Sequence, residues 1–440
     1  MVAYRPTSQS MQLVSLLLVP VCALVCLPCG LAQAHGDGPV RYDGYQLWRI
    51  NPQSQVELEA VEFLANKHNL SFWRYPSTID RPVDVLVSPN SVNELISFFK
   101  RSFLKFEILQ TDIQRLIDEQ YADRPDPGAE FAYEKYHTLA EINEWMDLMV
   151  KTHGDLVSKQ EIGKSYEGRT IYILKITTGA DKYHNGSASG KQAIFIEGGI
   201  HAREWISPAT VVYMTNQLLK QYDSSSEVKQ ILDGLDWYIL PVFNVDGYEY
   251  TWTTNRMWRK TRSRTRNPLC PGVDPNRNWD NNWCGAGSSR NPCSELYCGP
   301  KPFSEVEVEA VANFLQSGIN FRGFIDFHSY SQLWMTPYGW TTDLPKDYPK
   351  QIAQAEQSVK ALTAVFGTSY VYGTIANTLY VASGSSIDYV YDNLGVVYST
   401  TVELRDQGQR GFILPDSEII PSGQETFEGL KQYALFMLNN

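Results

Sequence analysis

Residues 192–205, QAIFIEGGIHAREW, join a short apolar run to a pair of glycines and then to a histidine and a glutamate. The run is typical of a buried β-strand, because it is short, apolar and bounded by glycine. His201 and Glu204 lie three positions apart, so in a helical turn both side chains project from one face and can share a metal ion. Pairs with this spacing also arise by chance, and a metal site needs a further ligand.

A second buried strand, expected over residues 321–327, ends beside His328. Catalytic zinc commonly has three nitrogen or oxygen ligands from the protein and one open position. His201, Glu204 and His328 make up that number, and they predict a site for one Zn²⁺. Taken alone, His328 is also compatible with a core histidine that is hydrogen-bonded to a backbone carbonyl.

A third apolar strand, residues 396–404, contains Glu403. A carboxylate in so apolar a run is costly unless it serves a metal, a partner or catalysis. The alternative is a salt bridge between Glu403 and Arg405. Because sites in open α/β sheets lie beyond the carboxyl ends of the strands, the ends of all three strands are expected to meet in one crevice.

The elements around these strands predict the architecture of a large unit. Apolar strands, including one over residues 237–242, alternate with helical segments such as residues 208–222 and 305–316. A helix over residues 139–153 is expected to open the unit. Such alternation indicates an α/β sheet with helices on both faces.

A smaller unit is expected upstream, between Arg41 and about Gln120. Its pattern of strand-like and helical stretches, β-α-β-β-α-β, predicts an open-faced sandwich of the ferredoxin-like α+β type. A capping box of Ser54 and Glu57 is expected to open its first helix, and Asn90 or Ser91 to cap its second. The stretch that follows, residues 121–132, is rich in Asp, Pro and Gly and predicts an exposed linker.

The N-terminus has the order of a secretory signal peptide. Arg5 precedes an apolar run from Leu13 to Leu27, and the small residues of Ala32-Gln33-Ala34 follow. A membrane anchor is the alternative, but the run is short for a span and contains Pro20. We therefore predict export of a secreted, extracellular protein.

The cysteines agree with export, and the net charge limits the expected partners. Of seven cysteines, three lie in the signal region, and the remaining four cluster within residues 270–298, as two disulfides that pin a loop would. A zinc knot is disfavoured, since the intervals fit no paired C-x-x-C arrangement. The formal charge of −11 and the pI near 5.2 argue against nucleic acid or an anionic membrane surface as a partner.

Five motifs in order give the chain a family resemblance. They are HAREW at 201–205, NRMWRK at 255–260, DPNRNW at 274–279, HSY at 328–330 and TVELR at 401–405. The chain resembles the zinc metallocarboxypeptidases of the carboxypeptidase A/B family, closely from about Tyr136 to Asn440 and more loosely over 41–120. The resemblance implies a mixed eight-stranded sheet with helices on both faces, preceded by the ferredoxin-like α+β pro-domain. It divides the chain into a signal peptide (1–34), an inhibitory pro-domain (35–120), an activation linker (121–132) and a catalytic domain (133–440).

The resemblance also implies roles for single residues. His201, Glu204 and His328 match the zinc ligands, and Asp274 matches the carboxylate that orients the first histidine. Glu403 matches the general base, and Arg259 the cation that stabilises the oxyanion. The remaining matches are the residues that hold the substrate, including its free carboxylate: Arg203, Asn276, Arg277, Ser329, Tyr330 and Tyr380. The family's disulfides would join Cys270 to Cys293 and Cys284 to Cys298.

Ile387 occupies the family position at the base of the pocket for the substrate's last side chain. Members that cut after basic residues carry an acid there, so an apolar floor favours aromatic and aliphatic side chains. Asp326 stands where digestive members of the family often have a small hydroxyl residue. If its carboxylate reached the pocket, basic or broad specificity would follow, and this is the alternative prediction. The other wall positions are small or apolar: Met335, Gly339, Ile375, Ala382 and Thr401.

The expected partners follow from these roles. They are the C-termini of peptides or proteins as substrate, and a protease that cuts the linker; Arg124 is the basic residue there, but Pro125 follows it. Neither nucleic acid nor a membrane is expected as a partner, and the enzyme is predicted to be a monomer. A protein that grips C-termini without hydrolysing them is a rival, but it predicts a lost ligand or base, and none is missing.

Overall fold

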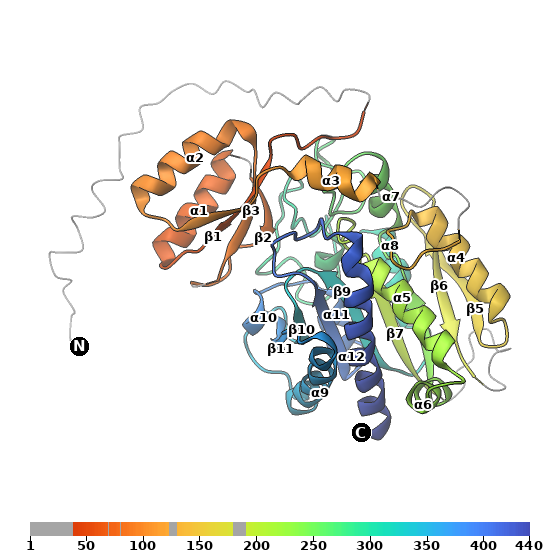
Figure 1. Cartoon of the computed structure of the whole chain (residues 1–440). Coiled ribbons are helices and arrows are strands. Elements are labelled where there is room, and N and C mark those ends of the chain that lie inside the picture. Colours follow the sequence, from red (N-terminus) through yellow and green to blue (C-terminus); the bar gives the residue numbers. More distant parts are fainter. Residues whose placement is uncertain (1–37, 69, 80, 123–129, 179–190) are drawn as a thin grey trace, which may run out of the picture. The chain divides into compact units, whose positions relative to one another are not determined.

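The computed structural model describes residues 38–68, 70–79, 81–122, 130–178 and 191–440 (Figure 1). The predicted signal peptide and most of the predicted linker lie outside these residues. In the part of the chain that is described, no helix is both long and apolar enough to span a membrane.

The small unit has the predicted order of elements. Its sheet has the strand order β2-β3-β1-β4, and every pair of neighbours is antiparallel. The two helices cover one face and enclose a core that includes Trp48, Leu95 and Phe99. This is the ferredoxin-like arrangement. The elements are β1 (Gln46–Ile50), α1 (Gln55–His68), β2 (Ser71–Arg74), β3 (Val83–Val87), α2 (Pro89–Ser102) and β4 (Phe106–Gln110).

Helix ends in this unit differ in detail from the prediction. The Glu57 N–H donates to Ser54 Oγ at 3.3 Å, but the Glu57 carboxylate accepts from the Gln53 N–H at 2.7 Å. The predicted cap of the second helix is wrong: α2 begins at Pro89, with Ser88 as its N-cap. Proline suits the first helical position, because that position needs no N–H.

A further helix, α3 (Ile113–Ala122), was not predicted. It takes in the first two residues of the predicted linker. Its buried face, which includes Ile113, Leu116 and Ile117, packs in a cluster with Tyr330 and Phe412 of the large unit. The apolar face of α3 therefore depends on partners that lie far along the chain, which a local pattern does not reveal.

The large unit is built on an eight-stranded mixed sheet in the order β11-β10-β12-β9-β7-β8-β6-β5. The four central strands, β12, β9, β7 and β8, are mutually parallel, and antiparallel pairs flank them. The eight-stranded sheet that the resemblance implied is thus present. Its strands are β5 (Val157–Lys164), β6 (Thr170–Ile176), β7 (Gln192–Gly198), β8 (Leu235–Leu240), β9 (Phe321–Ser329), β10 (Leu333–Thr336), β11 (Val371–Thr374) and β12 (Tyr398–Leu404).

Helices cover both faces of this sheet, as predicted. A side chain at Gly323 of β9 would meet Tyr433 of α12, so the odd-numbered positions of β9 face α12. Asp326, on the opposite face, is hydrogen-bonded to Ser386 of α11. Helices α5, α9 and α12 lie together on the first face (Figure 1). The helices are α4 (Leu139–Thr152), α5 (Ile206–Gln221), α6 (Ser226–Gly234), α7 (Val245–Thr253), α8 (Val306–Leu315), α9 (Tyr348–Phe366), α10 (Ile375–Thr378), α11 (Ser386–Asp392) and α12 (Ile419–Asn439).

The two glycines after β7 let the chain turn tightly into α5. Gly199 has a φ of +69°, which favours glycine, and its N–H donates to Ser207 Oγ at 2.9 Å. A Cβ at Gly198 would lie 2.9 Å from the same hydroxyl oxygen. Ser207 Oγ in turn donates to the Phe327 carbonyl at 2.5 Å. This turn ties the end of β7 to the end of β9, where His328 lies.

Two disulfides fasten the loop between α7 and α8. They join Cys270 to Cys293 and Cys284 to Cys298, which is the pairing that the resemblance implied. The same loop carries the short 3-10 helix η3 (Pro275–Arg277) and, just before it, Asp274.

Candidate active site

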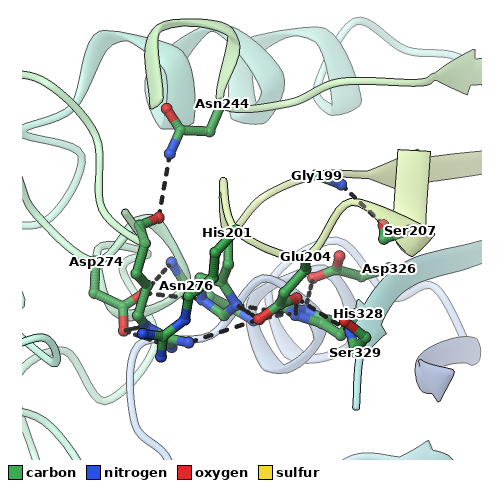
Figure 2. Close-up of polar contacts among 12 residues, drawn as sticks. Gly199, His201, Glu204, Ser207, Asn244, Asp274, Asn276, Asp326, His328 and Ser329 are labelled. Carbon is green, nitrogen blue, oxygen red and sulfur yellow. Dashed lines mark hydrogen bonds and ion pairs between the residues drawn. The ribbon is translucent and has the colours of Figure 1, made fainter. Parts of the chain in front are cut away.

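His201, Glu204 and His328 come together at the carboxyl ends of β7 and β9 (Figure 2). The Glu204 N–H donates to the His201 carbonyl at 3.2 Å, so the first two residues form a single turn just before α5. His201 Nδ1 lies 2.9 Å from Glu204 Oε1 and 3.1 Å from His328 Nδ1. Glu204 Oε2 lies 3.1 Å from His328 Nδ1. All three side chains are buried, and their ligand atoms lie within 4.8 Å of one another.

This donor set fits a zinc ion. Two imidazole nitrogens and a carboxylate oxygen converge on one point, and two histidines with one glutamate are an established ligand set of catalytic zinc. Burial alone would raise the pKa of Glu204, but the two histidines outweigh it and lower that pKa below its ordinary value. Glu204 therefore stays ionised beside the two rings. The residues that would hold Zn²⁺ are the three that the sequence singled out.

Asp274 contacts His201 on the side of the ring that faces away from the other two ligands, and Arg259 pairs with Asp274. Asp274 Oδ1 lies 3.1 Å from His201 Nε2, and Asp274 Oδ2 accepts from Arg259 Nη2 at 2.9 Å. Burial raises the pKa of Asp274, but Arg259 and His201 outweigh it and hold that pKa well below its usual range. Asp274 thus stays charged and fixes the His201 ring with Nδ1 toward the other two ligands.

Glu403 lies beside His328, since the two residues pair across β12 and β9. It lines the same pocket as the ligand cluster, and its Oε2 has no hydrogen-bond partner among the described residues. Burial raises the pKa of Glu403 to about 8. The alternative salt bridge to Arg405 does not form, because Arg405 donates to Glu425 and Glu418 instead. The Glu403 carboxylate is free to act on a molecule in the pocket.

Arg277 offers a free donor on the other side of this pocket. Its Nε donates to the Gly287 carbonyl at 2.9 Å and its Nη1 to the Asn276 carbonyl at 2.8 Å. Its Nη2 is buried and has no partner among the described residues. Tyr380, whose ring lies 5.9 Å from the guanidinium carbon, and Asn276 also line the pocket. Buried guanidinium groups are normally paired, so this one is suited to an anionic group that enters the pocket.

The rest of the pocket wall is mostly apolar. Met335, Ile375 and Ala382 line it, and Ile387 packs in one cluster with Met335 and Ile375. Asp326 is not among the lining residues; its Oδ2 lies 2.9 Å from His328 Nε2. Arg203, which was predicted to bind substrate, is not among the lining residues: its side chain is buried, and its Nη1 donates to Glu295 at 3.0 Å.

Sequence reasoning missed the residues of the small unit that enter this pocket. Trp73, Arg74 and Tyr75 line it together with the ligand cluster. The Trp73 ring lies 5.1 Å from that of Phe412, and the Tyr75 ring lies 6.2 Å from that of Tyr380. The only local signal was a run of aromatic and basic residues at the end of β2, which does not say what the run contacts.

Further contacts of the small unit surround the pocket. Tyr330 OH donates to Asp84 Oδ2 at 2.8 Å, and Asp84 also accepts from Arg49 at 2.7 Å. Arg74 Nη2 donates to Ser331 Oγ at 3.0 Å. Arg81 donates to three backbone carbonyls at the end of α10, those of Asn377, Thr378 and Leu379, directly before Tyr380.

Three metal-binding side chains at the carboxyl ends of parallel strands, beside a carboxylate oxygen without a partner among the described residues, are typical of metal-dependent hydrolases. Comparison with known proteins narrows the class. The family model of zinc carboxypeptidases matches residues 142–429, and the model of the carboxypeptidase activation peptide matches residues 48–120. The chain belongs to the zinc carboxypeptidase family. It is a metallocarboxypeptidase that uses one Zn²⁺ and is made with an activation peptide.

Relatives named carboxypeptidase A and carboxypeptidase B are both similar to the chain. Carboxypeptidase A1 of Sus scrofa is 42% identical over 90% of this chain and 94% of its own length. Carboxypeptidase B of Canis lupus familiaris is 38% identical over 95% of this chain and 99% of its own length. The solved structure of thrombin activatable fibrinolysis inhibitor matches with a TM-score of 0.83 at 34% identity, over 90% of this chain and 99% of that one. Identity alone therefore does not assign a specificity.

Proposed function

We propose that the mature enzyme releases aromatic and aliphatic residues from the C-termini of peptides and proteins. The observation that carries this proposal is the apolar cluster of Leu333, Met335, Ile375 and Ile387, of which Met335 and Ile375 line the pocket. Apart from Glu204 and Glu403, the described residues that line the pocket include no acid. A lysine or arginine side chain would lose its hydration there without gaining a partner.

Two other acids near the pocket are not among its lining residues. Asp326 Oδ2 accepts from Ser386 Oγ at 2.9 Å and lies against His328, while its Oδ1 is buried without a hydrogen-bond partner among the described residues. Asp388, next to Ile387, accepts from the Gly339 and Trp340 N–H groups at 3.0 and 3.1 Å. Burial raises the pKa of Asp388 to about 7, so this acid is poorly suited to hold a cation. Both observations favour apolar specificity over the basic alternative.

Arg277 Nη2, unpartnered among the described residues, supports the proposal that the enzyme acts at the C-terminus of the substrate rather than at an internal peptide bond. A substrate carboxylate would accept from Arg277 Nη2, with Asn276 and Tyr380 beside it. An internal peptide bond offers no such charge, so it gains nothing from this contact.

The residues around the ligand cluster support a hydrolytic mechanism. His201, Glu204 and His328 would hold Zn²⁺, which would supply polarisation of the scissile carbonyl and a lower pKa of bound water. Glu403 takes a proton from the attacking water and passes it to the leaving amine. Arg259 lines the pocket, with its Nη1 3.8 Å from Glu204 Oε1, and would stabilise the negative charge that develops on the carbonyl oxygen.

The specificity is tested with matched blocked dipeptides that end in Phe, Leu, Arg or Lys and are offered to the linker-cleaved enzyme. We expect release of Phe and Leu, and loss of this activity when a chelator removes the metal. Release of Arg or Lys at a comparable rate would overturn the apolar specificity and leave the mechanism intact. If no dipeptide were cleaved, the assignment of the catalytic residues would be wrong.

We further propose that the chain is secreted as a precursor in which the small unit blocks the pocket. Trp73, Arg74 and Tyr75 occupy its mouth, and Arg81 holds the segment before Tyr380. Cleavage in the linker would release the small unit and open the pocket to substrate. Exposed linkers of this composition are preferred sites of proteolysis.

Replacing Arg81 with alanine is expected to raise the activity of the uncleaved precursor toward a small blocked dipeptide. Loss of the hydrogen bonds from this charged group should weaken docking of the small unit by roughly 1.5–3 kcal/mol, or about 10- to 150-fold in the open fraction. Arg115→Ala is the matched control, because Arg115 pairs with Glu119 within α3. Equal activity of the two uncleaved variants would contradict the role of Arg81.

A further inference from the structure

Asp326 lies two residues before His328 on β9. Because side chains alternate along a strand, the two residues point to the same face of the sheet. The imidazole of His328 has one nitrogen on each side: Nδ1 faces Glu204 and His201, and Nε2 faces Asp326. In Figure 2 Asp326 lies beside His328, and a dashed line marks the contact between the two side chains.

The chemistry of the contact fits a bound metal. If Nδ1 of a neutral His328 binds a metal, its Nε2 carries a hydrogen and needs an acceptor. Asp326 Oδ2, 2.9 Å away, is such an acceptor. Asn276 Nδ2 also lies 3.2 Å from Nε2, but the Asn276 Oδ1 accepts from the Ser386 N–H at 2.9 Å. This bond turns the amide NH₂ of Asn276, a donor, toward His328, so the acceptor is Asp326.

The position of Asp326 is itself fixed. Its side chain is fully buried, and Ser386 Oγ donates to the same Oδ2 at 2.9 Å, whereas Oδ1 has no hydrogen-bond partner among the described residues. Burial of a carboxylate is costly unless an opposite charge or hydrogen bonds compensate for it. A histidine that binds a divalent cation supplies this compensation through its N–H.

The two histidine ligands thus have the same support. Asp274 lies against Nε2 of His201, and Asp326 lies against Nε2 of His328. One carboxylate comes from the loop before η3 and the other from the strand that carries the ligand. The departure of Asp326 from the family pattern gains a physical reason here that is unrelated to the specificity pocket.

We infer that Asp326 is a positioning residue of the zinc site. It fixes the ring of His328 with Nδ1 toward the metal, and this orientation strengthens zinc binding. The inference rests on the proposed assignment of His201, Glu204 and His328 as ligands. It predicts a tighter and more slowly exchanging metal than a small hydroxyl residue at position 326 would give. Loss of such an outer partner typically costs 10- to 100-fold in metal affinity.

The test measures the zinc dissociation constant of the full chain by competition with a chromophoric chelator, together with the rate of zinc loss. Asp326→Ala is expected to raise the dissociation constant roughly 10- to 100-fold. Asp326→Asn keeps the shape and one acceptor oxygen, so its affinity should lie between those of Asp326→Ala and the unaltered chain. In both variants the visible absorption bands of Co²⁺ bound in place of zinc should shift, since the ring is less well oriented.

Glu307→Gln is the matched control. Glu307 of α8 is also fully buried, and its carboxylate accepts from the Tyr166 N–H at 2.9 Å, but it is not part of the ligand cluster. We expect zinc affinity close to that of the unaltered chain. If Glu307→Gln lost as much affinity as Asp326→Asn, general disturbance of the core would explain both, and the inference would be wrong.

His328→Ala separates the inference from the assignment on which it rests. If this variant bound zinc as tightly as the unaltered chain, His328 would not be a ligand and the assignment itself would fail. If His328→Ala lost zinc while Asp326→Ala and Asp326→Asn bound it normally, only the role of Asp326 would be refuted. Thermal unfolding of the metal-free variants checks that each one is folded. If Asp326→Ala is not folded, Asp326→Asn alone tests the role of Asp326.

Discussion

Replacing Glu403 with alanine is expected to abolish peptide hydrolysis while the linker-cleaved enzyme still binds zinc. Glu403 is not one of the three residues whose ligand atoms converge on the metal, but it lies beside His328 across β12 and β9. Without it, no carboxylate at this position takes the proton from water. General acid–base catalysis contributes about 10²- to 10⁴-fold, and kcat should fall by at least that factor.

The measurement is kcat on a blocked dipeptide ending in Phe, with zinc content determined on the same sample. Glu403→Gln is the matched control, since it keeps the size and polarity of the side chain but cannot accept the proton. It should be as inactive as Glu403→Ala. Full activity in either variant would refute the general-base assignment. Loss of zinc would show that Glu403 supports the metal site instead.

Replacing Arg277 with alanine is expected to remove the preference for a free C-terminal carboxylate. In the structure Arg277 Nη2 is buried and has no hydrogen-bond partner among the described residues, so a substrate carboxylate would supply the partner that this nitrogen lacks. Truncating one partner of a buried, hydrogen-bonded charge pair costs about 2–5 kcal/mol, which corresponds to roughly 30- to several-thousand-fold in kcat/KM. Peptides with a C-terminal amide should be affected far less.

This prediction is checked by measuring kcat/KM for paired substrates that differ only in carboxylate or amide at the C-terminus. Arg277 also donates to the carbonyls of Gly287 and Asn276, so zinc content and thermal stability serve as tests of folding. Arg277→Lys keeps the charge but lacks the planar fork, and its activity should be only partly restored. Equal losses for the two kinds of substrate would refute the carboxylate-anchor role.

Much of the fold was predictable because its signals are local. The apolar runs that became β7, β9 and β12 are short and uniform, since strands buried on both faces need no polar alternation. Thr138 and Glu141 form a complete capping box at the start of α4, where a helix was expected. Helix ends were less certain: the start of α2 was misplaced by up to three residues because Pro89 was overlooked as a first helical residue.

The ligand cluster was predictable for a related reason. Each ligand lies at or just beyond the end of a parallel strand, and the ends of neighbouring parallel strands meet at one edge of a sheet. The order of strands and the positions of His201, Glu204 and His328 therefore bring the three donors together. The roles of single residues in the substrate pocket came from the family resemblance rather than from such a pattern.

The sequence by itself thus predicted the fold class, the central strands and a group of side chains that could hold a metal, because periodicity and strand ends are properties of neighbouring residues. Only the tertiary structure decided which partners the buried charges have. Arg405 pairs with Glu425 rather than Glu403, and Asp84 meets Tyr330, which lies 246 positions away. The same holds for Asp326, whose place behind His328 depends on Ser386 of α11 and on the Asn276 amide of η3. Such pairings depend on how distant segments pack, and no local pattern encodes them.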